Sequence, residues 1–169
     1  ALPSFGVEPS SRRSLRVASP ALVPGPDADL VAEHALLLEE YLARDSIALP
    51  LTPLERPILL HGHCHQKAMG ALSPVQEVLA TIPGASVETV ETSCCGMAGA
   101  FGYGRDTAET SLKMAELDLL PAVRAAPSDA LIVADGTSCR HQIADGAGRA
   151  ALHVARVLDM SLTKDGLAK

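Results

Sequence analysis

Hydrophobic residues in this chain gather in short continuous runs that alternate with segments of helical spacing. Two such runs cover residues 57–62 and 129–134, and the second is centred on Leu131-Ile132-Val133. Continuous apolar runs of this length are typical of strands that are buried on both faces. Residues 86–91 give a weaker strand pattern, so we predict three strands in all.

Apolar residues at intervals of three and four predict amphipathic helices over residues 27–44, 73–82, 106–120 and 149–158. Ser73 with Gln76, and Asp106 with Glu109, have the spacing of a capping box and predict where two of these helices begin. Strands that alternate with helices require crossover connections. The predicted fold class is α/β: a three-layer Rossmann-like unit with a small, mostly parallel sheet flanked by helices.

The two ends of the chain give weaker patterns. Residues 1–26 are rich in Pro, Ser and Gly and are predicted to be irregular, and the polar tail over 161–169 is predicted to be flexible. Ala1 rather than Met stands first, and we expect a fragment of a longer polypeptide.

Composition and charge exclude some classes of function. Apolar residues make up 47% of 169 residues but Trp is absent, so the core of a single domain must be aliphatic. A net charge of -6 argues against nucleic acid as a partner. No apolar run approaches the roughly 18 residues of a transmembrane segment, and no signal peptide is evident. We expect a soluble, cytoplasmic protein, with a peripheral position at the inner membrane face as an alternative.

All four cysteines follow predicted strands. Cys64 comes after the first strand, Cys94 and Cys95 after the second, and Cys139 after the third. The carboxyl ends of parallel strands lie at one edge of a sheet, where open α/β sheets bind their ligands. Three loops that are distant in sequence can therefore deliver four thiolates to one point.

Four thiolates would satisfy zinc, but structural zinc sites usually take cysteines that are two to four residues apart. The adjacent Cys94 and Cys95 suit a polynuclear cluster better, because each sulfur can bind a different iron. We favour iron-sulfur and leave zinc open. His61, His63 and His65 bracket Cys64 and are assigned to hydrogen bonding around the metal, although one of them could be a ligand.

Other interpretations remain open. Core packing would explain Cys139 alone, a strained disulfide could join Cys94 to Cys95, and Cys64 beside a histidine could act as a nucleophile. The glycine-rich segment 99–104 lacks the spacing and the lysine of a P-loop. Three arginines could balance thiolate charge or simply be solvated: Arg105, Arg140 and Arg149.

Three motifs carry a resemblance to a known family: HCHQK at 63–67, SCCGMAGAFGY at 93–103 and ADGTSCRHQI at 134–143. They resemble the cysteine-rich CCG domain that occurs in heterodisulfide reductase, in the iron-sulfur protein of glycolate oxidase and in anaerobic glycerol-3-phosphate dehydrogenase. The motifs are most similar to the C-terminal part of fused FAD-dependent D-lactate or D-2-hydroxyacid dehydrogenases. The resemblance runs from about residue 2 to residue 158.

The resemblance implies two tandem repeats, of which residues 27–160 would be the second and residues 1–26 the end of the first. FAD and the substrate would bind to parts outside this chain, which would relay electrons from a flavin domain during oxidation of a 2-hydroxy acid. The alternative is a zinc-stabilised, non-redox interaction domain. The implied ligands of a 4Fe-4S cluster, with zinc as the alternative, are Cys64, Cys94, Cys95 and Cys139, and the residues implied around them are His63, His65 and Gln142.

The chain departs from the family's pattern at two positions. Gly136 stands where the family has the first cysteine of a Cys-x-x-Cys motif, which leaves four thiolates and favours a cubane cluster. Ser11 stands where relatives often have a cysteine after Glu-Pro-Ser. A site belonging to the first repeat is therefore not expected here.

Overall fold

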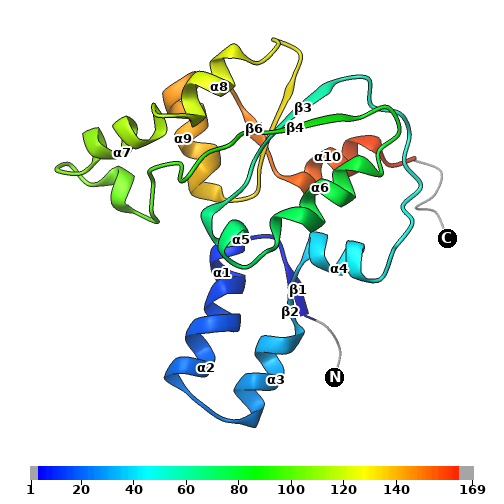
Figure 1. Ribbon diagram of the computed structural model, residues 1–169, viewed down its shortest axis with the longest axis vertical. Coiled ribbons are helices and arrows are strands. Elements are labelled where there is room, and N and C mark those ends of the chain that lie inside the picture. The colour runs from blue at the N-terminus through cyan, green and yellow to red at the C-terminus, as the bar shows by residue number, and fades with distance from the viewer. Residues whose placement is uncertain (1–3, 164–169) are drawn as a thin grey trace.

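The computed structural model describes residues 4–163, so most of the predicted flexible tail, 164–169, lies outside the described residues. A four-stranded sheet has the order β4-β3-β5-β6, and every neighbouring pair is parallel (Figure 1). Its strands are β3 (Pro57–His61), β4 (Ser86–Thr89), β5 (Leu131–Ala134) and β6 (Ala151–Leu152). The predicted parallel α/β fold is confirmed, and β6 is an additional strand.

Helices cover both faces of this sheet. Alternate strand residues point to opposite faces, so Leu60 and Val133 pack with α6 and α10, while Leu59 and Ile132 pack with α8 and α9. The helices are α5 (Cys64–Ala68), α6 (Leu72–Ala80), α7 (Ala108–Ala115), α8 (Leu119–Ala125), α9 (Thr137–Ala147) and α10 (Val154–Ser161). The resulting three layers place the carboxyl ends of β3, β4 and β5 side by side.

The helix boundaries differ from those predicted. The expected helix over 106–120 is two helices, because Pro121 is tolerated in the first turn of α8 but would clash with the preceding turn of a continuous helix. No side-chain cap forms at the start of α6 or α7, so both predicted capping boxes are wrong. The last helix begins at Val154, because β6 takes the residues before it.

The N-terminal part is more regular than we predicted. It contains β1 (Ser4–Gly6), α1 (Pro9–Arg13), a π-helical turn at Ser14–Ala18 and α2 (Ser19–Leu22). The helix predicted over 27–44 is interrupted, because its middle forms a strand that pairs with β1. It consists of α3 (Pro26–His34), β2 (Ala35–Leu37) and α4 (Leu38–Arg44), and α1 to α3 project from the body of the molecule (Figure 1). The predicted domain boundary at residue 26 stays a prediction.

The C-terminal end of the described part is held in place. Ser161 is buried and ends α10, and Thr163 donates a backbone hydrogen bond to Pro50. The flexible tail predicted over 161–169 stays a prediction.

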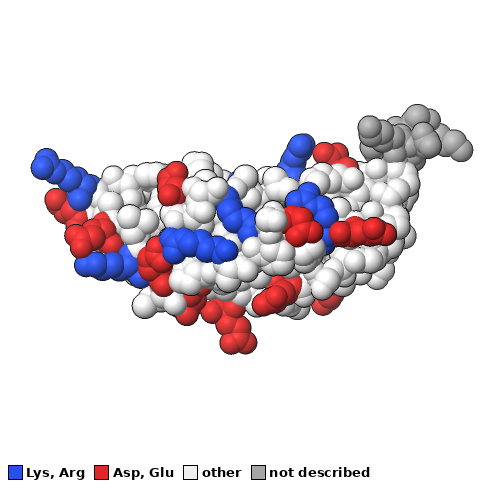
Figure 2. Space-filling model, turned by 90° about the horizontal axis from the view of Figure 1, so that it is seen from above, with Lys and Arg blue, Asp and Glu red and all other residues white. Residues whose placement is uncertain are grey.

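The surface carries charge of both signs (Figure 2). On the face shown in Figure 2, acidic and basic side chains are interspersed. Among residues 4–163, no helix has the length and apolar character needed to cross a membrane.

Candidate metal centre

Three adjacent strands carry the cysteines to one edge of the sheet. Cys64 is the first residue of α5, directly after β3, and Cys139 lies in the first turn of α9, after β5. Cys94 and Cys95 lie in the irregular segment after β4. We expected loops at all three places, but Cys64 and Cys139 lie in the first turns of helices. The predicted convergence depends on parallel strands and is seen in the structure.

Cys95 and Cys139 are in direct contact through their thiols. Their Sγ atoms are 3.3 Å apart, with Cys139 as the donor, and both side chains are buried. The hydrogen bond from Cys139 lowers the pKa of Cys95, and the same bond raises the pKa of Cys139. This contact therefore favours the ionised form of Cys95 and the protonated form of Cys139.

Cys64 and Cys94 complete the group. Both line a hollow of about 310 Å³ together with Cys95, and Ser138 closes one side of it. Burial raises the pKa of Cys64, and the neighbouring charges of Cys94 and Cys95 raise it further. The charges of the neighbouring cysteines thus raise the pKa of both Cys64 and Cys139.

Gly96 explains why a glycine must follow the two cysteines. Its φ is +87°, and a Cβ there would lie 2.2 Å from the carbonyl oxygen of Ser111. In this conformation the Gly96 N–H donates a 3.3 Å hydrogen bond to the sulfur of Cys94. The glycine lets the backbone pass against α7 and turn one donor toward the site.

Gln142, one of the residues that we placed around the ligands, holds the backbone of the site. Its Nε2 donates to the carbonyl oxygen of Cys95 at 2.9 Å and to that of Ser111 at 3.1 Å. Because Gln142 is buried on α9, it ties the second cysteine segment to the helix that carries Cys139.

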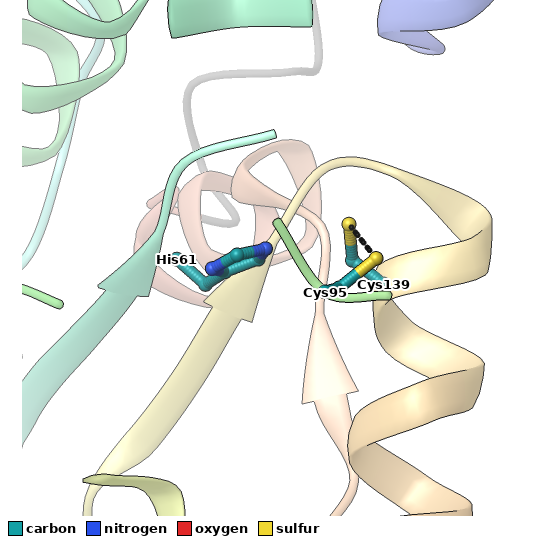
Figure 3. Close-up of side chains that lie close together, drawn as sticks. All are labelled: His61, Cys95 and Cys139. Carbon is teal, nitrogen blue, oxygen red and sulfur yellow. Dashed lines mark hydrogen bonds between the residues drawn. The ribbon is translucent and has the colours of Figure 1, made fainter. Parts of the chain in front are cut away.

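His61, one of the three histidines that bracket Cys64 in the sequence, faces the thiols. It is 2% exposed at the end of β3, and one of its ring nitrogens lies within 4.8 Å of the sulfurs of Cys95 and Cys139. Figure 3 shows its ring edge directed toward this pair. Nδ1 is 3.0 Å from Thr92 Oγ1, whereas Nε2 is buried without a hydrogen-bond partner among the described residues. The position of His61 three residues before Cys64, at a strand end, is the sequence signal for this placement.

His63 and His65 lie on either side of Cys64 and both line the hollow. The Nδ1 of His63 accepts a 3.1 Å hydrogen bond from the backbone N–H of His65, so His63 caps α5. The two rings meet edge to face with centroids 4.9 Å apart. Burial lowers the pKa of both histidines, which favours neutral imidazoles.

The basic residues have mostly structural roles. Arg149 donates to carbonyl oxygens before β5, including that of Ala130, at the edge of the sheet opposite the thiols. The prediction that it balances thiolate charge is wrong. Arg140 donates to the carbonyl of Ala134 near the site, and Arg105 is exposed. Lys67 donates to the carbonyl of Ser93 at 3.0 Å and so joins α5 to the segment that carries Cys94.

A second buried polar group lies behind the site. Glu39, Asp135 and His153 place ligand-type atoms within 4.8 Å of one another. Both nitrogens of His153 are engaged, because Nδ1 accepts from Ala155 N at 3.0 Å and Nε2 donates to Val7 O at 2.6 Å. Without a free imidazole lone pair, this group is a buried carboxyl pair rather than a metal site.

The residues at the sheet edge fit a thiolate-bound metal. Four sulfurs line or adjoin one hollow, and the buried Nε2 of His61 needs a partner that the described residues do not supply. The hollow is several times larger than the roughly 30 Å³ that one water molecule occupies, so it has room for more than a single ion.

Comparisons with known proteins agree with an oxidoreductase origin. The chain is 31% identical over 114 residues to one subunit of the anaerobic glycerol-3-phosphate dehydrogenase of Escherichia coli, a match that covers 66% of the chain and 28% of that subunit. It is 30% identical over 128 residues to D-2-hydroxyglutarate dehydrogenase of Escherichia coli, which covers 74% of the chain and 12% of that enzyme. No family model and no solved structure matches the chain. The chain is thus similar to one segment of each dehydrogenase, and it spans less than a third of either.

Proposed function

We propose that this chain is the electron-transfer part of a flavin-dependent dehydrogenase that acts on a 2-hydroxy acid. In this proposal Cys64, Cys94, Cys95 and Cys139 bind a 4Fe-4S cluster. The observation that carries the proposal is the convergence of the four thiols from three separate strand ends: three line one hollow, and Cys139 contacts Cys95 at 3.3 Å. The similarity to two dehydrogenases supports it.

The protein's own groups prepare this site for a metal. Thiolates rather than thiols are the ligands, and the hydrogen bond from Cys139 lowers the pKa of Cys95. Gln142 fixes the backbone of Cys95. Burial of Cys95 and Cys139 keeps water from two of the four sulfurs. A bound cluster would supply one-electron carriage between a flavin and a further acceptor.

The proposed partner is a flavin domain, on the same or on another polypeptide. Flavin and substrate would bind there, and the cysteine site would receive the electrons. The relatives are named as dehydrogenases, and this chain matches only one segment of each. A division of labour between segments accounts for both facts.

A zinc-stabilised, non-redox domain is the second candidate, and one observation favours it. The sulfurs of Cys95 and Cys139 are only 3.3 Å apart, and a nitrogen of His61 lies within 4.8 Å of both. This compact set resembles the ligand shell of a single ion, for which zinc commonly takes sulfur and nitrogen ligands.

Anaerobic reconstitution with iron and sulfide separates the two candidates. The proposal predicts broad visible absorbance that bleaches when dithionite is added. Stoichiometric zinc, retained without colour during the same treatment, would favour the second candidate. A chain that takes up neither metal would exclude both.

A further inference from the structure

Position 136 has no side chain, and the ring of His63 uses the space. A Cβ at Gly136 would lie 2.1 Å from Cδ2 and 2.9 Å from Nε2 of His63. The same point is 3.2 Å from the sulfur of Cys139. The backbone of Gly136 has φ -69°, which any residue can adopt. The glycine is therefore required by the His63 ring and not by the backbone conformation.

The hydrogen bonds of His63 fix which nitrogen carries the proton. Nδ1 accepts from the N–H of His65 at 3.1 Å, so the lone pair of Nδ1 is in use. A neutral imidazole with that lone pair occupied carries its proton on Nε2. Nε2, which borders the open position at Gly136, is therefore a donor, and the sulfur of Cys139 borders the same position. Nε2 cannot bind a metal unless the cap of α5 is broken.

From this juxtaposition we propose that His63 is a positioning and tuning residue, whose Nε2–H donates a hydrogen bond to a metal-bound thiolate, that of Cys139. The absent side chain at Gly136 makes room for this donor. The inference rests on the proposed function for its redox consequence, but the protonation of Nε2 can be tested without iron.

A hydrogen bond from His63 to a ligand sulfur would change the reduction potential, because reduction adds negative charge to the cluster. A reduced cluster carries more negative charge on its sulfurs than an oxidised one, so a hydrogen bond to sulfur stabilises the reduced state more. His63 therefore raises the reduction potential of the site. Its partner Gly136 has the same effect indirectly, because any side chain there would displace the ring.

A double-mutant cycle on the whole chain tests the inference. The variants are His63→Ala, Gly136→Ala and the double variant, with His63→Gln as a conservative replacement that keeps an N–H donor. After reconstitution, iron per chain and the midpoint potential are measured for each. We expect the potential to shift downward in both single variants, to shift no further in the double variant, and to return toward the wild-type value in His63→Gln.

An unchanged potential in His63→Ala with full iron content would overturn the inference, as would fully additive shifts in the double variant. Side-chain ¹⁵N NMR of the zinc-loaded chain gives an independent readout. A proton on Nε2 of His63 supports the inference, and a proton on Nδ1 or a metal-bound Nε2 overturns it. Failure of the chain to take up iron would contradict the proposed function, whereas the NMR result bears on His63 alone.

Discussion

Glu39 gives the sharpest prediction about stability. It is fully buried on α4, and neither carboxyl oxygen has a hydrogen-bond partner among the described residues. Burial, together with the nearby charge of Asp135, raises the pKa of Glu39 from 4.5 to about 8. The folded chain therefore keeps this carboxyl protonated at neutral pH, whereas the unfolded chain ionises it near its ordinary pKa.

The direction and size of the pH effect on stability follow from the linkage between protonation of Glu39 and folding. Because the folded-state pKa is raised, the contribution of Glu39 to stability is fully present below about pH 4.5 and is lost as the pH rises through about 8. Each unit of pKa difference corresponds to ~1.4 kcal/mol, so the free energy of unfolding falls by up to roughly 5 kcal/mol over this window. That is a large share of the stability of a typical domain.

Glu39→Gln removes the titration while keeping the shape and a hydrogen-bond donor. Urea unfolding of the metal-free chain, followed by circular dichroism at several values between pH 5 and 9, measures the free energy of unfolding. The variant is expected to lose much less stability with rising pH than the wild type. Glu33→Gln, at an exposed position on α3, is the matched control and should follow the wild type. Parallel pH curves for Glu39→Gln and wild type would refute the reasoning.

Further predictions concern the site itself. Gly96→Ala is expected to destabilise the fold by roughly 2–4 kcal/mol in urea unfolding, because its φ of +87° and the Ser111 carbonyl leave no room for a Cβ; a loss below the experimental error would contradict this. Gln142→Ala should cost about 1–3 kcal/mol, because the carbonyl of Cys95 loses its buried donor, and it should slow metal uptake in a reconstitution assay. Removal of bound metal by a chelator should lower the melting temperature of the wild type but not that of Cys139→Ser, and equal shifts would argue against a metal at these thiols.

The sequence predicted the main sheet because β3 and β5 are continuous apolar runs, a pattern that burial on both faces imposes. The strand β2 could not be predicted in the same way. Its residues Ala35–Leu37 sit within a helical spacing and become a strand only because they pair with β1, some thirty residues earlier. The strand β6 is two residues long and depends on the adjacent β5.

In the candidate site, too, one part could be predicted from the sequence and another part could not. The convergence of the cysteines follows from strand ends in a parallel sheet, so the sequence was enough to predict it. The orientation of His61 toward Cys95 was not predictable, because it depends on which face of β3 the ring takes and on Thr92 holding its other nitrogen. The role of Gly136 likewise appears only when the ring of His63 is seen beside it.

The most direct test of the central claim is the iron and sulfide content of the anaerobically reconstituted chain, compared with single serine variants of the cysteines. Cys95→Ser should lose the cluster, and Ser138→Ala, which lines the same hollow without a thiol, should keep it. Near four iron and four sulfide per chain in the wild type and little in Cys95→Ser is the predicted result. Full iron content in Cys95→Ser, or none in the wild type, would contradict the account.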